Sequence, residues 1–314
     1  MDRAVVFDVD GVIRHNNASK KDGCYYCLKY EDVDYIDGIF KAHKYLQTAG
    51  YKIFWVTMQN CIQEGLVTWE TVSSILNRMW IYFKDRGIDI DGYRICQSPD
   101  ESDESKVKSK VEAIMGFSNI DLSKSIGIGD RKSDIDAYKL SGIGATIQAL
   151  TPYGDKKCNV NYHYDSPLCM KNDGRGFAHP EVLSEVLMVI HGCNDVPRLT
   201  RIAENFPHVK KVWGDEYWIV NSLEGSYCSK ILILNPDHVS SLHYHKNKCE
   251  TFTVLAGIVK IKHKDTEHIC ITGDSILINP ENEHRFEALI SPAVILETST
   301  WHDDCDTYRI EESK

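Results

Sequence analysis

The hydrophobic pattern changes once along the chain, and this change constrains the fold more than any other feature. Up to about residue 150, short β-rich runs alternate with amphipathic helical stretches, whereas from residue 213 onward only short alternating strands follow, separated by turn residues. The first pattern is typical of a parallel sheet covered by helices, and the second of a β-barrel or jelly roll. The 314 residues are enough for two cores. We therefore expect a doubly wound α/β domain followed by an all-β domain.

The expected elements place the boundary between the two domains. Strands are expected at residues 4–7, 52–56, 93–96, 125–129 and 145–147, and helices at 37–49, 68–86 and 133–141. A polar stretch at 151–175, a helix at about 179–191 and a polar break at 192–198 follow. The predicted domains are residues 1–192, with the last helix as a linker, and residues 193–314.

The composition excludes several classes of protein. Hydrophobic residues make up 42% and charged residues 26%, and no apolar run is long enough for a membrane span. The first residues lack the features of a signal peptide, so we expect a cytoplasmic protein without a membrane partner. A net charge of -10 argues against a nucleic-acid partner. The eleven cysteines are expected as free thiols, and the pair Cys24 and Cys27 lacks a second pair that would complete a zinc site.

Carboxylates cluster after two expected strands of the first domain. Asp8 and Asp10 end the first strand, and side chains two residues apart on a strand share a face. One such carboxylate can attack phosphorus while the other moves protons. Asp130 and Asp134 follow the strand at 125–129, four residues apart at a helix start. Since carboxylates and phosphate repel each other, the site requires a hard cation, and Mg²⁺ fits best.

Further polar residues could hold the phosphate itself. The hydroxyl of Thr57 ends the strand at 52–56, and Lys106 or Lys108 could neutralise phosphate charge. Each piece alone is more often a solvated turn or a surface charge, but all of them lie at strand ends and in this order. Their combination favours a phosphate site.

Four segments of the first domain resemble the motifs of the haloacid dehalogenase superfamily: DVDG, VT, a lysine and GDRKSD. Residues 1–148 are most similar to its histidinol phosphate and heptose bisphosphate phosphatase branch. The resemblance implies that Asp8 is the nucleophile and Asp10 the general acid and base. It also implies roles for two further sets of residues. The Mg²⁺ set is Asp8, Asp10, Asp130 and Asp134, and the phosphate-binding set is Thr57, Gln59, Lys106 and Arg131. Because only Cys96 stands where this branch often has a cysteine-rich zinc loop, we expect no zinc in this domain.

Histidines at metal-ligand spacing mark the second domain. His243 and His245 alternate on one strand, Glu250 follows five residues later, and His284 comes after a turn. Three imidazoles and one carboxylate suit a divalent transition metal such as Zn, Mn, Fe or Ni, with positions left open for substrate oxygens. An isolated HxH is more often structural, but the spacing to Glu250 and Gly257 is specific.

Residues 213–310 resemble the cupin superfamily, and the run SLHYHKNKCETFTVLAGIVKI is similar to its mannose-6-phosphate isomerase and lyxose isomerase branches. The resemblance implies interconversion of an aldose and a ketose, with Glu297 and His302 as acid, base or substrate contacts, although barrel-lining roles fit them equally well. Lys260 and Arg285 are weaker candidates for a phosphate contact than for exposed charges. Cupins often pair through their sheets, so a homodimer through this domain is a further expectation.

Three functional hypotheses remain at this point. In the first, a Mg²⁺-dependent phosphatase and a metal-dependent isomerase act on related sugar phosphates, in a pathway that makes an activated sugar for a surface glycan. In the second, the cupin domain is a non-catalytic sugar-binding or dimerising module attached to the phosphatase. A third, in which the first domain only binds phosphate, fits poorly because both Asp8 and Asp10 are present.

Overall fold

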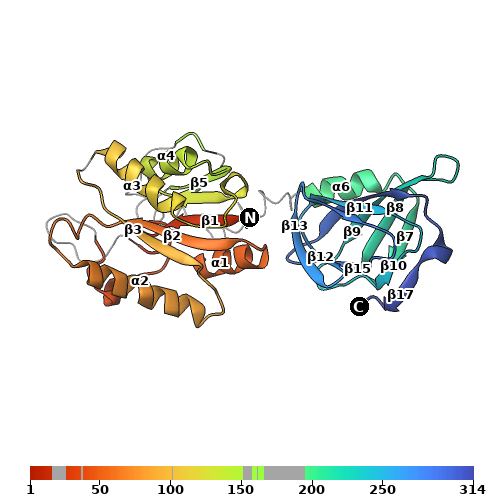
Figure 1. The fold of residues 1–314 in the computed structure, drawn as a ribbon, viewed down its shortest axis with the longest axis horizontal. Helices are drawn as coiled ribbons and strands as arrows, with labels where there is room; N and C mark the ends of the chain where they lie inside the picture. Colours follow the sequence, from red (N-terminus) through yellow and green to blue (C-terminus); the bar gives the residue numbers. More distant parts are fainter. Residues whose placement is uncertain (16–25, 37, 101, 151–157, 161, 166–194) are drawn as a thin grey trace, which may run out of the picture. The chain divides into compact units, whose positions relative to one another are not determined.

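The computed structural model describes residues 1–15, 26–36, 38–100, 102–150, 158–160, 162–165 and 195–314. The chain divides into two compact units, Met1–Val186 and Leu187–Lys314, which we call the α/β unit and the β unit (Figure 1). The predicted boundary at residues 192 and 193 and the predicted helix at 179–191 lie outside the described residues. Among the described helices, none combines the length and the apolar character that a membrane crossing needs.

The α/β unit is built on a six-stranded parallel sheet with the order β3-β2-β1-β4-β5-β6. Its strands are β1 (Ala4–Asp8), β2 (Lys52–Met58), β3 (Gly92–Cys96), β4 (Ile126–Gly129), β5 (Ala145–Leu150) and β6 (Tyr162–Asp165). Its helices are α1 (Ile39–Thr48), α2 (Trp69–Lys84), α3 (Asp103–Met115) and α4 (Lys132–Leu140). The five predicted strands and three predicted helices are present, and the doubly wound α/β class is confirmed.

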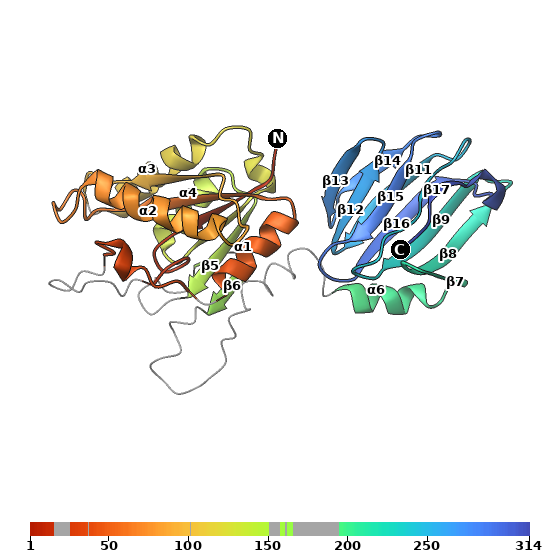
Figure 2. The same cartoon turned by 90° about the horizontal axis from the view of Figure 1, so that it is seen from below.

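Helices cover both faces of this sheet, as the views in Figures 1 and 2 show. On one face, Val6 belongs to an apolar cluster with Ile114 of α3 and Tyr138 of α4. On the other face, the ring of Phe7 stacks on His43 of α1 at 4.2 Å between centroids. Every residue of β1 is therefore buried, which explains why the run AVVFD has no polar alternation before its last residue.

Helix α3, which begins in an acidic run, was not predicted from the sequence. In the structure, the hydroxyl of Ser102 accepts a hydrogen bond from the backbone N–H of Ser105 and caps the helix. Asp103 and Glu104 then lie in the first turn, where negative charge interacts favourably with the helix dipole. The acidic run is thus the start of a helix.

The β unit contains two antiparallel sheets with the orders β13-β12-β15-β10-β17 and β14-β11-β16-β9-β8-β7. The strands of the first sheet are β10 (Leu242–Tyr244), β12 (Ile258–His263), β13 (Thr266–Ile271), β15 (His284–Ala288) and β17 (Tyr308–Glu311). Those of the second are β7 (His208–Lys211), β8 (Gly214–Ser222), β9 (Tyr227–Leu234), β11 (Glu250–Ala256), β14 (Ser275–Ile278) and β16 (Ala293–Thr300). This arrangement confirms the predicted jelly roll.

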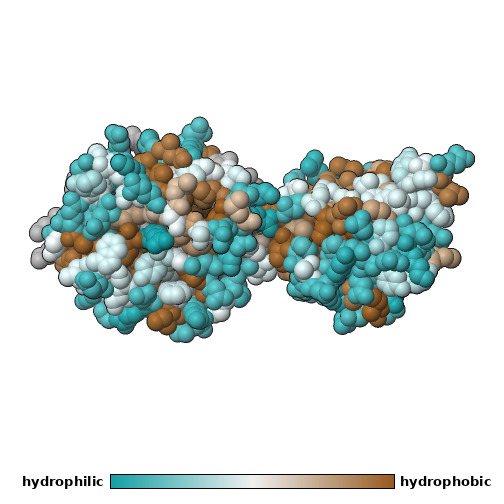
Figure 3. All heavy atoms as spheres, viewed as in Figure 1, coloured by the Kyte–Doolittle hydropathy of each residue, from teal (hydrophilic) through white to brown (hydrophobic). Residues whose placement is uncertain are grey.

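Two apolar clusters position the strands of the β unit. Phe252, Leu232 and Ile295 belong to the cluster that also contains Phe286 of the other sheet, so it forms the core between the sheets. A second cluster joins Val196 and Ala203 of helix α6 (Val196–Ala203) to β8, β9 and β16. The predicted polar break at 192–198 was wrong for residues 196–198, because Asp195 and a proline in the first turn start α6 there. Hydrophilic side chains dominate the visible surface of each unit in Figure 3.

Candidate functional site

Three buried carboxylates meet at the carboxyl end of the parallel sheet. Asp8 is the last residue of β1, Asp130 directly follows β4, and Asp134 lies in the first turn of α4. Their ligand oxygens all lie within 4.8 Å of one another, and all three residues are buried. Parallel strands bring their carboxyl ends to one edge of the sheet, which is where such sheets bind ligands.

Two glycines allow the carboxylates to approach the backbone this closely. Gly11 has a φ of +87°, and a Cβ there would lie 2.4 Å from Oδ2 of Asp130. A Cβ on Gly129 would lie 2.4 Å from Cβ of Asp134. Any larger residue would push a carboxylate out of the group, so glycine at both positions is part of the site.

A buried lysine that the sequence analysis missed lies among these carboxylates. Nζ of Lys110 is 3.0 Å from Oδ1 of Asp8 and also donates to Oδ1 of Asp134. Burial lowers the pKa of Lys110, but the negative charges of Asp134 and Asp8 raise it by more, so its pKa lies above the usual value. The prediction had chosen Lys106 or Lys108. Lys106 lies one turn earlier on α3, and Lys108 is exposed, so only Lys110 reaches the end of β1.

The charge balance of this group fits a bound cation. Burial raises the pKa of Asp8 well above its usual value, and Asp134, Asp130 and Asp10 raise it further against the opposing effect of Lys110. Three buried carboxylates with one ammonium retain negative charge, and a hard divalent cation with oxygen ligands would neutralise it. Asp8, Asp130 and Asp134 therefore fit the predicted Mg²⁺.

Asp10, the fourth predicted metal ligand, is not part of the group of three carboxylates, and its side chain is engaged with neighbouring polar residues. Its oxygens accept hydrogen bonds from Arg14 at 2.8 and 3.2 Å, from Gln59 at 2.6 Å and from Thr57 at 3.2 Å. Burial raises the pKa of Asp10, but Arg14, Gln59 and Thr57 lower it more, so the net shift is downward. The shared face was expected from strand geometry, but β1 ends at Asp8.

The predicted phosphate contacts divide into two groups. Thr57 and Gln59 are buried and lie beside Asp10, and Nε2 of Gln59 also donates to Oγ1 of Thr57 at 2.7 Å. Arg131 is exposed at the start of α4, where its backbone N–H donates to Oδ2 of Asp134 at 2.9 Å. Its backbone thus positions a carboxylate, while its side chain points to solvent.

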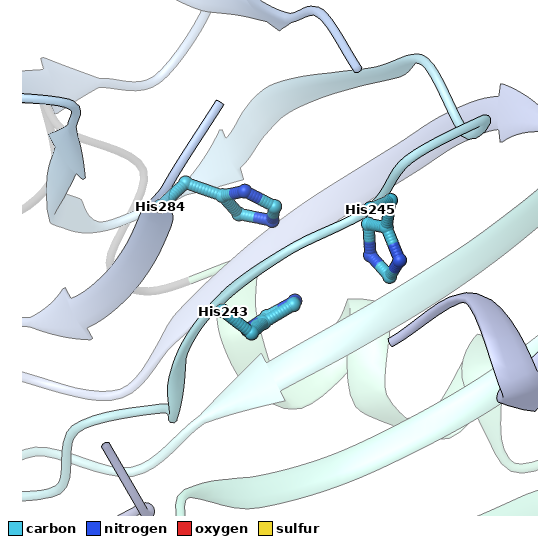
Figure 4. Close-up of side chains that lie close together, drawn as sticks. All are labelled: His243, His245 and His284. Atoms are coloured by element: carbon cyan, nitrogen blue, oxygen red, sulfur yellow. The ribbon is translucent and has the colours of Figure 1, made fainter. Parts of the chain in front are cut away.

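The three predicted histidines converge in the β unit, as Figure 4 shows. His243 and His284 are paired across β10 and β15, and His245 follows directly after β10. One ring nitrogen of each lies within 4.8 Å of the others. Alternation along the strand and pairing across the sheet bring them together, as the sequence predicted.

Backbone carbonyls orient all three rings. Nδ1 donates to the carbonyl of Ser241 at 3.0 Å in His243, to that of Asp306 at 2.8 Å in His245, and to that of Asn282 at 3.0 Å in His284. A carbonyl can only accept, so each Nδ1 carries a proton, and each Nε2 is the ring nitrogen left to bind a metal. Burial lowers the pKa of His243 to about 3 and also lowers that of His245. These are neutral imidazoles, the form that binds metals.

Glu250 completes the predicted ligand set. Its Oε2 lies 2.9 Å from Nε2 of His284, and its Oε1 lies 3.6 Å from Nε2 of His245. Oε2 of Glu250 and Nε2 of His284 are both buried without a hydrogen-bond partner among the described residues. A cation shared by this carboxylate oxygen and this ring nitrogen would satisfy both. The donor set therefore suits a divalent transition metal.

A cavity of about 340 Å³ opens beside these ligands, and we call it the β-unit cavity. Its lining includes the predicted residues Glu297 and His302, and the ring of His302 lies 6.4 Å from that of His245. Lys260 and Arg285 do not line it. Lys260 pairs with Glu287 at 2.8 Å, which fits the interpretation as a charge on a strand surface. Arg285 pairs with Glu311 at 2.9 Å, but its side chain is only 17% exposed, and its Nε and Nη2 are buried without a hydrogen-bond partner among the described residues.

The sequence analysis also missed a row of alternating charges along the wall of this cavity. Nζ of Lys248 lies 2.6 Å from both Glu250 and Glu297. Lys230 follows at 3.9 Å from Glu297 and 3.7 Å from Glu216, whose other oxygen lies 3.7 Å from Lys211. These residues lie on or beside consecutive strands of one sheet. We call this set the charge row: Glu250, Lys248, Glu297, Lys230, Glu216 and Lys211.

Comparisons with known proteins agree with this two-part arrangement. A D-glycero-beta-D-manno-heptose-1,7-bisphosphate 7-phosphatase of Vibrio cholerae is 31% identical over 158 residues, which cover 47% of this chain and 81% of the relative. The corresponding alpha-anomer 7-phosphatase of Campylobacter jejuni is 31% identical over 147 residues, covering 46% and 81%. Residues 230–299 match the cupin domain family.

Solved structures were also compared. KdgF from a Halomonas species is 11% identical with a TM-score of 0.30, covering 32% of this chain and 92% of that one. Oxalate decarboxylase from Bacillus subtilis is 19% identical with a TM-score of 0.30, covering 34% and 30%. Likenesses at this level carry no functional argument.

A parallel α/β unit with acidic residues at its strand ends, joined to a jelly roll with an interior histidine cluster, defines a two-domain enzyme with two candidate metal sites. The chain belongs to the haloacid dehalogenase superfamily as a phosphatase, and it carries a cupin domain in its second unit.

Proposed function

We propose that the α/β unit hydrolyses a phosphorylated sugar by way of an aspartyl phosphate on Asp8. The observation that carries the proposal is the buried Asp8 carboxylate beside Lys110, Asp130 and Asp134. The curated relatives, whose names specify removal of the 7-phosphate of a heptose bisphosphate, support a sugar phosphate as the substrate class.

The proposed reaction has two steps. An oxygen of Asp8 bonds to phosphorus while the phosphorus–oxygen bond to the sugar breaks, and Asp10 gives a proton to the leaving oxygen. Asp10 then takes a proton from the water that attacks the aspartyl phosphate, which releases phosphate. In the resting site Arg14 holds Asp10 ionised. Its proton donation therefore requires this contact to loosen when substrate binds.

The residues around Asp8 neutralise or position charged groups in both steps. Asp8, Asp130 and Asp134 would hold Mg²⁺, which supplies positive charge to the phosphate oxygens. Lys110 takes the place that the sequence analysis gave to Lys106. Thr57 and Gln59 fix the side chain of Asp10, and the exposed Arg131 is a candidate contact for the outer part of the substrate.

The test replaces the nucleophile with its isostere. Asp8→Asn should abolish phosphate release from a panel of sugar phosphates with Mg²⁺, while circular dichroism and the metal content of the β unit stay unchanged. Near-normal turnover by the folded variant would refute the assignment of Asp8. Phosphate release that does not depend on Mg²⁺ would refute the metal assignment.

For the β unit we propose a metal-dependent isomerase that interconverts an aldose and a ketose. His243, His245, His284 and Glu250 would hold the metal, which would supply positive charge to the carbonyl and the neighbouring hydroxyl of the sugar. Glu297 lines the cavity and is the candidate base that moves a proton between adjacent carbons, with His302 at the oxygens. The two activities on related sugars would serve nucleotide-sugar or surface-glycan synthesis.

One observation favours the alternative of a non-catalytic sugar-binding or dimerising domain. Oε1 of Glu297 is held by Lys248 at 2.6 Å and by Ser299 at 3.3 Å, so this oxygen is already engaged. We therefore propose a comparison in the full-length protein. His243→Ala combined with His245→Ala should remove the transition metal, as measured by elemental analysis, and should abolish aldose–ketose exchange as followed by NMR.

The outcomes separate the two candidates. An isomerase loses exchange together with the metal, and phosphate release continues. If the wild-type protein exchanges no sugar with any of the four metals, the non-catalytic alternative is supported. Unchanged metal content in the double variant would refute the histidine site itself.

A further inference from the structure

We propose that the ligand of the β-unit cavity is a sugar derivative that carries an acidic group, and that Lys230 binds this group. The inference deepens the proposed function, because it assumes that the cavity binds a sugar, but it does not require isomerisation. It rests on the contacts of one buried ammonium group.

The ammonium of Lys230 has too few partners for its burial. Its side chain is 3% exposed. Among the described residues its hydrogen-bond partner is Nδ1 of His302, at 3.4 Å. An ammonium has three donors, and buried donors are normally satisfied. Two N–H groups of Lys230 are therefore available to a ligand.

The neighbouring carboxylates do not satisfy these donors. Oε1 of Glu216 and Oε1 of Glu297 lie 3.7 and 3.9 Å from Nζ, beyond hydrogen-bond distance. Lys248, the other buried lysine of the charge row, contacts its two carboxylates at 2.6 Å. Lys248 thus forms two short hydrogen-bonded ion pairs, whereas Lys230 lies near its carboxylates without a hydrogen bond to them.

Aromatic and histidine side chains hold Lys230 in place. Nζ lies 3.9 Å from the ring centroid of Trp218, a cation–π contact that restricts its movement. Nε2 of His302 bonds to Oδ1 of Asp304 at 3.1 Å, so Nδ1 of His302 is the acceptor for Lys230. The ammonium is thus oriented before a ligand binds, which reduces the entropic cost of binding.

The position of Lys230 suits a ligand that also reaches the metal ligands. Lys230 lines the β-unit cavity together with His243 and His245. The ring of His302, its hydrogen-bond partner, lies 6.4 Å from that of His245. A sugar that places hydroxyl oxygens at the histidines of this cavity would therefore share the cavity with the ammonium of Lys230, which can receive its acidic group.

The charges of the cavity favour an anion over a neutral sugar. The charge row alternates in sign, with three carboxylates and three ammonium groups that cancel. The other charged residues that line the cavity, Lys210, Arg309, Asp304 and Glu312, cancel in the same way, so a divalent cation at the histidines would leave an excess of positive charge. A ligand with a carboxylate or phosphate would offset this excess, since uncompensated charge in a buried site is unfavourable.

The experiment measures binding, so that isomerisation need not occur. Full-length Asp8→Asn protein, loaded with Zn²⁺ in the β unit, is titrated calorimetrically with D-glucose, D-glucuronate and D-glucose 6-phosphate, and then with further neutral and acidic sugar pairs. The glucuronate and phosphate arms distinguish a carboxylate from a phosphate. We expect acidic members to bind more tightly than their neutral parents.

Three variants assign the preference to Lys230. Lys230→Met should weaken binding of the acidic sugar by about 10- to 100-fold, the effect of losing a charge-assisted hydrogen bond, with little change for the neutral sugar. The matched control is Lys210→Met, because Lys210 lines the same cavity but is already paired with Asp215 at 3.0 Å. Lys230→Arg keeps the charge and should retain the preference for acidic sugars.

Each outcome decides the inference. It is overturned if no acidic sugar binds, if neutral parents bind equally well, or if Lys210→Met causes the same loss as Lys230→Met. Should Lys230→Met not fold, Lys230→Gln decides, because it removes the charge but keeps a hydrogen-bond donor, and an unchanged affinity for the acidic sugar would then overturn the inference. Absence of aldose–ketose exchange would count against the isomerase alone and leave the binding result intact.

Discussion

Replacing Lys110 tests the charge balance of the α/β site most directly. Its side chain is 5% exposed, and it bonds to both Asp8 and Asp134. Removing one partner of a buried ion pair costs roughly 3–5 kcal/mol, because the remaining charges stay buried without compensation. Lys110→Met should therefore lower the free energy of unfolding by about this amount when EDTA is present. Excess Mg²⁺ should reduce the loss, since a divalent cation compensates the same carboxylates.

The same variant should lose activity even when the metal is saturating. A buried donor that stabilises developing charge contributes roughly 10²- to 10³-fold to kcat. We expect a loss of this size in phosphate release from a sugar phosphate, measured with Mg²⁺ in excess. Lys106→Met is the matched control, because Lys106 lies on the same helix one turn earlier. It should change kcat less than about threefold and the unfolding free energy by less than about 0.5 kcal/mol.

Two results would refute this reasoning. If Lys106→Met reduced kcat as much as Lys110→Met, the lysine that matters in catalysis would be the one chosen from the sequence. If the stability loss of Lys110→Met were the same in EDTA and in Mg²⁺, the lysine and the metal would not share the carboxylates. Denaturant titration in both buffers distinguishes these cases.

Three further predictions concern residues that support the two sites. Burial lowers the pKa of His43 to about 3; the unfolded chain therefore gains a proton first as pH falls below 6.5, and stability should drop by up to about 1.4 kcal/mol per pH unit toward pH 3. Denaturation of His43→Leu should show a shallower acid slope, and an equal slope would contradict a neutral His43. Asp306→Ala leaves the backbone N–H groups of Lys246, Asn247 and Lys248 without their acceptor. It should lower the free energy of unfolding by roughly 2–4 kcal/mol and reduce the metal content of the β unit. Asp303→Ala, which removes one backbone hydrogen bond, should lower it by about 1 kcal/mol. Equal losses of stability in thermal melts would show that the three hydrogen bonds to Asp306 are not what stabilises this segment. Gly11→Ala should weaken Mg²⁺ binding in calorimetry, because its Cβ would overlap Asp130, and unchanged affinity would show that the carboxylate has room to move.

Local spacing was sufficient to predict part of both sites. The period of two along a strand predicts that His243 and His245 share a face, and the apolar run before Asp8 predicts its place at a strand end. The structure brings these side chains to their predicted neighbours. The element types were equally predictable, since long periodic stretches such as the one that forms α2 determine their own structure.

The remaining features depend on contacts between distant segments. Lys106, Lys108 and Lys110 are indistinguishable in sequence, and only the start of α3 at Asp103 decides which one reaches Asp8. Asp10 was assigned to the metal from the family resemblance, whereas its contacts with Arg14, Gln59 and Thr57 arise only when distant segments meet. Nothing in the sequence distinguishes Lys230 and Lys248 from other lysines in strands and loops, because their role depends on their position beside Glu297, which is distant in sequence.

The charge row also has an evolutionary consequence. Since adjacent members are opposite in sign, losing Lys248 alone would leave Glu250 and Glu297 as neighbouring like charges inside the protein. Such a change is costly unless a second member changes with it. Among natural homologues, substitutions at these positions should therefore occur in compensating pairs, and a domain that exchanged the whole row for apolar residues would accommodate a different class of ligand.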